Sequence, residues 1–349
     1  MRRKYYPAID IVKIVCAILI VFIHTSPLGT VNGMLNSLLV NYISRIAVPF
    51  FFISSGFLLF KKADVNDPDV SVIKKYLKRI LLLYLFWSAV YFPFTALQMY
   101  WSREPAKALA VFANWAKNMI FSAGFGFLWY LPATLVAVAV VSFLLKRGLK
   151  INTVIFIGAI LYCIGLCGQS YFGLVSAIPF PDGLKNVIKA FYDFTVTTRN
   201  GVFEGVIFIA LGAKLSREEK NGSFGLSAAG FVISEILFLA EFWFTSKMEW
   251  QLEYDMYIFL VPAAYFLMKA TLCLEPKISS EKIRFLRPYS TLIYFTHMIP
   301  AEIINIALRG KVTNSLLLFF TVFIITLVLS TAIVLLSRTK RFGILKNIY

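Results

Sequence analysis

Long apolar stretches alternate with short polar segments along the whole chain of 349 residues. A helix needs about 20 consecutive apolar residues to cross the hydrocarbon core of a bilayer. We therefore predict an all-α fold, a polytopic membrane helix bundle with about ten transmembrane helices. The expected spans are 9–28, 36–60, 77–97, 127–145, 151–168, 201–215, 224–245, 254–274, 288–308 and 315–337.

The composition supports this interpretation. Hydrophobic residues make up 59% of the chain and charged residues only 15%, which is too apolar for an ordinary soluble globule. We find no low-complexity linker and no internal repeat of 20–50 residues. Residues 1–349 are therefore expected to form a single membrane domain.

The basic residues predict the orientation of the chain. Short cytoplasmic loops carry an excess of Lys and Arg. With the N-terminus inside, one side of the membrane receives the cationic clusters at 2–4, 61–79, 146–150, 214–220, 277–287 and 338–346. We therefore expect both termini to be cytoplasmic. The net charge of +17 follows from this topology and suits anionic lipid, so a nucleic-acid partner is not expected.

Three basic residues lie in the first two expected spans: Lys13, His24 and Arg45. A charge at bilayer depth costs about 2.5–3.5 kcal/mol on insertion scales, so such residues pair, face a wet cavity or carry function. Lys13 and His24 are eleven residues apart, which places them on nearly the same helix face, about 16 Å apart along the axis. The alternatives are a snorkelling anchor for Lys13, a hydrogen-bonded helix end for His24 and a structural cation for Arg45.

Further ionisable residues lie in the later spans. The structural alternative for each acid is an ion pair or an interfacial position, and for the histidine a hydrogen bond to a neighbouring helix. We favour the structural alternative for Glu235, Glu241 and Glu302. The candidate acidic and imidazole groups are Glu204, Glu235, Glu241, His297 and Glu302.

The motifs of soluble enzymes do not occur. The chain has no glycine-rich phosphate loop and no paired Cys-x-x-Cys, and two histidines are too few for a histidine-rich metal site. We expect no bound metal. The second span contains Pro49 and Ser54-Ser55-Gly56, which predict a kink and a close helix contact. The longest outer loops are expected at 98–126 and 169–200.

Several motifs together resemble the acyltransferase-3 family of integral membrane acyltransferases. Two departures are Lys13, where the family commonly has Arg, and Phe127, where a polar residue is common. The motifs are the basic-x10-His element from Lys13 to His24, "SRIAVPFFFISSGF" at 44–57, "LWYL" at 128–131, "RNGVFEGVIFIALG" at 199–212 and "YSTLIYFTH" at 289–297.

Within that family, "HTSPL", "LWYLPA" and "TRNGVF" are similar to the membrane half of vancomycin-resistance serine racemases, which is linked to serine uptake. No racemase half is expected, because the chain leaves no room for an α/β barrel after Tyr349.

The resemblance implies a multi-pass protein of a bacterial plasma membrane that transfers an acyl group, with acetyl expected, from cytoplasmic acyl-CoA to a hydroxyl of an envelope glycan. Acyl-CoA is then a donor substrate, and no cofactor is bound permanently. The alternative is a carrier for a small polar solute such as L-serine, although no inverted repeat of broken helices is detected. The implied catalytic residues are His24 and Arg45, and the implied substrate-binding residues are Lys13, Trp129, Tyr130, Arg199, Glu204 and His297.

Overall fold

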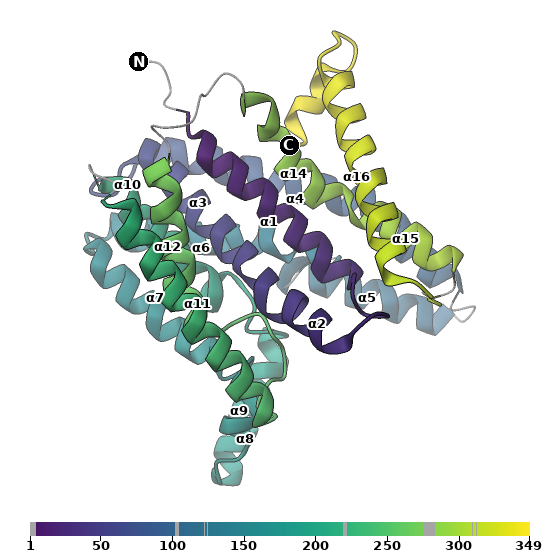
Figure 1. Cartoon of the computed structure of the whole chain (residues 1–349). Coiled ribbons are helices and arrows are strands. Elements are labelled where there is room, and N and C mark those ends of the chain that lie inside the picture. The colour runs from purple at the N-terminus through teal and green to yellow at the C-terminus, as the bar shows by residue number, and fades with distance from the viewer. Residues whose placement is uncertain are drawn as a thin grey trace. The chain divides into compact units, whose positions relative to one another are not determined.

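The computed structural model describes residues 5–101, 105–121, 123, 125–218, 222–274, 283–308, 310–311 and 313–349. Within these ranges the chain forms helices and no strand, so the predicted all-α class is confirmed (Figure 1). Some of the cations that predict the orientation lie outside the described residues, namely those at 2–4, 220 and 277–282. The cytoplasmic position of both termini stays a prediction.

The chain divides into two compact units. The first consists of Met1–Phe51, Lys220–Phe231 and Phe266–Tyr349, and the second of Phe52–Glu219 and Val232–Tyr265. Three helices contribute residues to both units: α3 (Ala47–Ala63), α11 (Phe224–Lys247) and α12 (Leu260–Leu274). The prediction of a single domain remains a prediction.

The first unit is organised around α1, which packs against α14, α16 and η2. Helix α1 begins with Pro7 and ends where Ser26 adopts a left-handed conformation with φ 46°. Its elements are α1 (Pro7–Thr25), α2 (Gly33–Ser37), the π-helical η1 (Leu38–Tyr42), the 3-10 turns η2 (Ile43–Ile46) and η6 (Arg284–Leu286), α14 (Arg287–Thr296), α15 (Met298–Ala307), α16 (Ser315–Ser337) and the 3-10 turn η7 (Gly343–Asn347).

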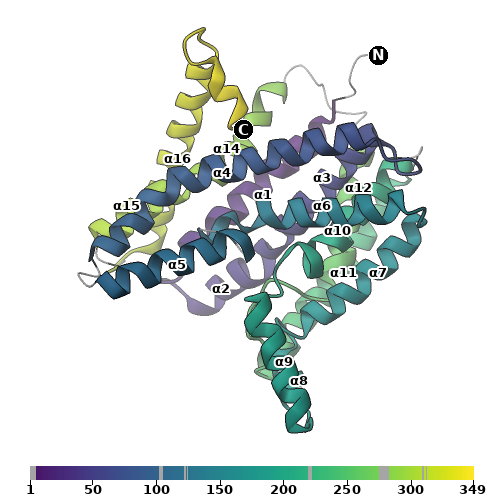
Figure 2. The same ribbon diagram turned by 180° about the vertical axis from the view of Figure 1, so that it is seen from behind.

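The second unit packs α4 against α5 and α6, and α10 against α6 and α7 (Figure 2). Its elements are α4 (Val70–Trp101), α5 (Pro105–Phe121), the 3-10 turn η3 (Gly126–Trp129), α6 (Tyr130–Lys146), α7 (Ile151–Leu166), α8 (Phe172–Ser176), α9 (Asp182–Thr195), the π-helical η4 (Gly201–Gly205) and α10 (Val206–Arg217).

Six helical segments in the described chain are long and apolar enough to cross a membrane. The other four expected spans coincide with shorter helices, namely α7, α12, η4 with α10, and α14 with α15. A membrane protein is therefore supported, whereas ten spans are not confirmed. The six segments are Pro7–Thr25, Gly33–Ala63, Val70–Leu97, Gly126–Lys146, Phe224–Lys247 and Ser315–Ser337.

The second expected span is helical but irregular. The π-helical η1 and the 3-10 turn η2 precede the regular helix α3. Pro49 has no N–H to donate to the carbonyl of Arg45, so the regular hydrogen-bond ladder cannot continue back through this turn. The Ser44 hydroxyl instead donates to the Leu39 carbonyl at 2.7 Å. Arg45 thus lies where the helix changes its winding.

The two long outer segments are not simple loops. The stretch expected as a loop at 98–126 contains the end of α4 and all of α5, and the stretch at 169–200 contains α8 and α9. Their sequences explain the difference. Helix α5 is rich in alanine, a strong helix former, and α9 places its apolar residues on one face.

Two glycines bring α3 and α10 into close contact within the second unit. A Cβ on Gly56 would collide with the backbone of Ile209, and a Cβ on Gly212 would collide with the Ile53 carbonyl. Small residues allow such close backbone approach in membrane helices. The predicted close contact at Ser54-Ser55-Gly56 is therefore observed.

Candidate functional site

Two histidine rings meet in the first unit. His24 lies in the last turn of α1, and His297 follows directly after α14. Their ring centroids are 5.2 Å apart, with an angle of 39° between the ring planes. His297 is fully buried, whereas His24 is exposed. Of the two imidazoles, only that of His24 therefore has exposed surface.

The tautomer of His297 is fixed by its own helix. Its Nδ1 lies 3.0 Å from the Ile293 carbonyl oxygen and 2.8 Å from the Tyr294 carbonyl oxygen. Carbonyl oxygens only accept hydrogen bonds, so Nδ1 must carry a proton and donate it. In the neutral ring, Nε2 then holds the lone pair. In catalytic and metal sites, too, a hydrogen bond from one ring nitrogen to a carbonyl or carboxylate orients the imidazole and sets the state of the other nitrogen.

Arg45 belongs to the turn η2, which packs against α1. Its Nη2 donates to the Asn41 side-chain oxygen at 3.0 Å, and the side chain is half-buried. Lys13 is half-buried on α1, about 16 Å before His24 along the helix axis. Lys13, His24, Arg45 and His297 therefore all belong to the first unit.

The other predicted site residues belong to the second unit. Trp129 ends η3 and is buried, and Tyr130 begins α6. The Tyr130 hydroxyl lies 2.9 Å from the Ser55 hydroxyl oxygen, and the Tyr130 ring packs on Phe52 with centroids 4.8 Å apart. Ser55, for which helix packing was the favoured interpretation over a nucleophile, thus also forms a hydrogen bond with a tyrosine of the predicted site.

Arg199 is held by two contacts of its guanidinium. Nη1 forms an ion pair with Asp255 Oδ2 at 2.9 Å, and the guanidinium carbon lies 5.0 Å from the centroid of the Trp129 ring. Burial works against the charged form, but Asp255, Glu253 and Glu204 together raise the pKa of Arg199 above its ordinary value. The predicted role of Arg199 in acceptor binding stays a prediction.

Glu204 lies in the π-helical η4 and is 1% exposed. Asn200 caps the start of this segment: its side-chain oxygen accepts hydrogen bonds from the backbone N–H groups of Val202 and Phe203 at 2.9 and 3.1 Å. Short π-helical segments occur frequently at functional sites. Glu204 therefore occupies a specialised backbone segment, as Arg45 does beside η1.

Glu241 has a structural role. Its carboxylate accepts hydrogen bonds from the backbone N–H groups of Ile258 and Phe259 at 2.7 and 2.9 Å and from the Tyr171 hydroxyl at 2.8 Å. Burial, reinforced by the nearby carboxylate, raises the pKa of Tyr171, so the hydroxyl keeps the proton that it donates. The favoured structural interpretation is thus supported for Glu241. Glu235 and Glu302 are half-buried, and the structural interpretation stays a prediction for both.

One functional-looking cluster was missed by sequence reasoning. The side-chain amide of Gln169, which is 1% exposed, lies 3.4, 3.3 and 3.3 Å from Thr197 Oγ1, Thr198 Oγ1 and Glu253 Oε2. The signal in the sequence is only a group of polar residues at the ends of two outer segments. Their partners lie up to 84 residues apart, so no local spacing reveals them.

Comparisons with known proteins agree with the motifs. The family model of the acyltransferase-3 domain matches residues 6–335. An amino-acid racemase of Enterococcus faecalis is 29% identical over 350 residues, covering 95% of this chain and 46% of that protein. A serine/alanine racemase of Enterococcus gallinarum is 26% identical, covering 94% of this chain and 45% of that protein.

The chain thus spans less than half of the length of these curated relatives, and no solved structure matches it. The family match, in contrast, extends over nearly the whole sequence and includes every residue of the histidine pair, the Arg45 turn and the η4 segment. The chain therefore belongs to the acyltransferase-3 family of membrane proteins.

Proposed function

We propose that the protein is a membrane O-acyltransferase that moves an acyl group, with acetyl as the first candidate, from cytoplasmic acyl-CoA to a hydroxyl of an envelope glycan. The observation that carries the proposal is the contact between the exposed ring of His24 and the buried, tautomer-fixed ring of His297. The family supports the reaction class, and the pair supplies a suitable base.

His24 acts as the general base in this proposal. Imidazole titrates near neutral pH and can therefore accept and return a proton during one reaction cycle. It takes the proton of the acceptor hydroxyl while the oxygen attacks the thioester carbonyl. The tetrahedral intermediate then collapses, the carbon–sulfur bond breaks, and the imidazolium returns the proton to the CoA thiolate.

His297 and Arg45 support that step in different ways. His297, predicted from the sequence to bind substrate, is fully buried and in this proposal acts as a positioning residue, because its ring is fixed by two backbone carbonyls and packs against His24. Arg45 either stabilises the developing oxyanion or holds His24 in place. Electrostatic stabilisation of this kind is strongest in a site that excludes water.

Lys13 contributes to donor binding. It lies on the same helix as His24 and about 16 Å closer to the expected cytoplasmic side, a spacing that suits an extended pantetheine arm between the CoA phosphates and the thioester. An ammonium attracts phosphate as a point charge. In this proposal the Lys13 end of α1 therefore binds the CoA phosphates, and the His24 end carries out acyl transfer.

The competing proposal is a carrier for a small polar solute such as L-serine. It is supported by the resemblance of the motifs to the membrane half of serine racemases that is linked to serine uptake, and one curated relative is named a serine/alanine racemase. A serine carrier has no reason to bind acyl-CoA, so donor binding separates the two functions.

Calorimetric titration of the purified protein with acetyl-CoA tests the proposal. We expect saturable binding, retained in Lys13→Arg and weakened several-fold or more in Lys13→Glu by like-charge repulsion. Raised salt should weaken wild-type binding in part, because exposed charges are screened. Serine uptake into proteoliposomes should be undetectable. No acetyl-CoA binding together with saturable serine flux would replace the acyltransferase by the carrier.

A further inference from the structure

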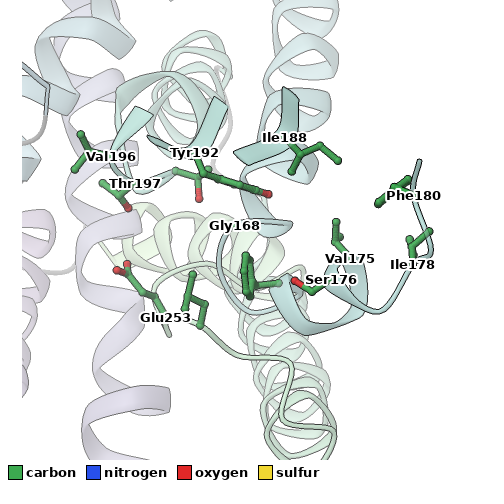
Figure 3. Close-up of a pocket in the computed structure, with 13 residues that line it drawn as sticks. Gly168, Val175, Ser176, Ile178, Phe180, Ile188, Tyr192, Val196, Thr197 and Glu253 are labelled. Atoms are coloured by element: carbon green, nitrogen blue, oxygen red, sulfur yellow. The ribbon is translucent and has the colours of Figure 1, made fainter. Parts of the chain in front are cut away.

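The second unit contains a cavity of about 450 Å³ between α8, α9 and the segments that follow α7 and α11. This volume lies in the range of small-molecule sites in proteins. Its walls are mainly apolar and include Phe172, Val175, Ile178, Phe180 and Ile188. Figure 3 shows Val175, Ile178, Phe180 and Ile188 at one end of the cavity and Glu253 with Thr197 at the other.

Hydrogen bonds hold the residues at the polar end of the cavity in place. The buried side-chain amide of Gln169 reaches both Thr197 and Glu253. In addition, the Leu252 backbone N–H donates to the backbone carbonyl of Gln169 at 3.1 Å. Because a carboxylate only accepts hydrogen bonds, the contact with Glu253 also fixes which end of the Gln169 amide carries the nitrogen. The Glu253 carboxylate is thereby held at the cavity wall.

The charge of the lining points to a cation. Of the described residues that line the cavity, Glu253 alone is charged. Arg199 acts on Glu253 electrostatically, but its guanidinium forms its ion pair with Asp255. A carboxylate beside apolar walls favours a ligand that brings its own positive charge and hydrogen-bond donors.

The aromatic lining points the same way. The rings of Phe172 and Tyr192 both line the cavity and meet edge to face, with centroids 6.2 Å apart and 70° between the planes. Phe180 lies at the end of the cavity opposite Glu253, beside the apolar body of a ligand (Figure 3). Aromatic faces attract ammonium groups, and proteins that recognise organic ammonium ligands use aromatic side chains in this way.

We propose that this cavity binds an organic ammonium ion whose apolar body fills the space between α8 and α9 and whose head is held by Glu253. The head donates to the Glu253 carboxylate, and the Thr197 hydroxyl lies at the same end of the cavity (Figure 3). The site belongs wholly to the second unit. The proposal therefore does not depend on acyl transfer or on the histidine pair.

The test uses two probes with the same body and different heads, 2-phenylethylamine and 2-phenylethanol. Each is titrated calorimetrically into the full-length protein in detergent, with empty micelles subtracted. We expect the ammonium to bind at least several-fold more tightly than the alcohol. Glu253→Gln should weaken amine binding about tenfold or more and leave alcohol binding nearly unchanged, because only the charge-assisted contact is lost.

Two further variants locate the binding event. Glu249→Gln is the matched control, because Glu249 is an exposed carboxylate of the same segment outside the cavity lining, and it should change nothing. Val175→Trp should fill the cavity and abolish binding of both probes, which also tests the site should Glu253→Gln not fold. Equal affinities for the two probes, an undiminished amine preference in Glu253→Gln, or amine binding that survives Val175→Trp would each overturn the proposal.

Discussion

The histidine pair of the first unit and the Glu241 cluster of the second show two uses of ionisable groups in an apolar chain. Glu241 accepts three hydrogen bonds, two of them from backbone N–H groups seventeen and eighteen residues away. His297 is fixed by carbonyls of its own helix, and the ring of His24 beside it is exposed. A carboxylate whose oxygens already accept hydrogen bonds from the protein, such as Glu241, stabilises the fold. A pair of imidazoles that is held in a fixed orientation and has one exposed ring can instead take part in a reaction.

The comparison predicts its largest effect at His24. His24→Ala should lower acyl transfer on the order of 10²–10⁴-fold, the contribution of a positioned general base. The protein should still insert and elute as a folded species, because the His24 ring is exposed. Transfer activity is measured with labelled acetyl-CoA, and folding by size-exclusion chromatography. Full activity in a folded His24→Ala variant would remove His24 from the mechanism.

Arg45 provides the second prediction. Arg45→Lys should lower transfer about tenfold or more despite the retained charge, because the guanidinium holds partners in a fixed planar geometry that an ammonium cannot reproduce. One such partner is the Asn41 side-chain oxygen. Initial rates for Arg45→Lys and Arg45→Ala are compared with wild type. Near-normal rates in Arg45→Lys beside an inactive Arg45→Ala would show that positive charge alone is sufficient.

Glu241 should behave in the opposite way, affecting stability before activity. Glu241→Leu leaves the backbone N–H groups of Ile258 and Phe259 without their acceptor, so we expect a loss of at least about 2 kcal/mol in unfolding free energy. Glu249→Gln, at an exposed carboxylate, should stay within about 0.5 kcal/mol of wild type. Both are measured by unfolding in detergent. Equal stability of the two variants would contradict a structural role for Glu241.

The smallest effect is expected at the ion pair of Arg199 and Asp255. Both side chains keep part of their solvent exposure, at 29% and 13%. Asp255→Asn should therefore cost only about 1 kcal/mol of unfolding free energy, since screening weakens partly exposed pairs. The difference from wild type should shrink as salt is raised. A difference independent of salt would show that the hydrogen bond, rather than charge, carries the effect.

The sequence predicted the helices well and their contacts poorly. Hydrophobic runs identified α16 to the residue and α1 to within three residues at each end, because apolarity and length are local properties. Pro49 correctly signalled an irregular second span. The prediction of loops was wrong for α5 and α9, since their apolar residues occupy one face and do not form a continuous run.

The candidate site shows the same limit. Single-residue arguments identified His24 and His297 separately, but 273 positions of chain separate two rings whose centroids lie 5.2 Å apart. The hydrogen-bonded cluster around Gln169 was not predicted at all. An uncharged amide in an outer segment does not stand out in the sequence as a charge in an apolar span does. Tertiary packing determines which residue a polar side chain contacts, and local sequence patterns do not reveal that partner.

The most direct test of the acyltransferase account is a single transfer experiment in sealed proteoliposomes. Acetyl-CoA labelled in the acetyl group is supplied to the face that carries the Lys13 end of α1, and release of the CoA thiol is followed together with label on a glycan acceptor. We predict that wild-type protein releases CoA in step with acceptor labelling and that His24→Ala does neither. CoA release and labelling that persist in His24→Ala, or saturable serine flux without any CoA release in wild type, would contradict the account.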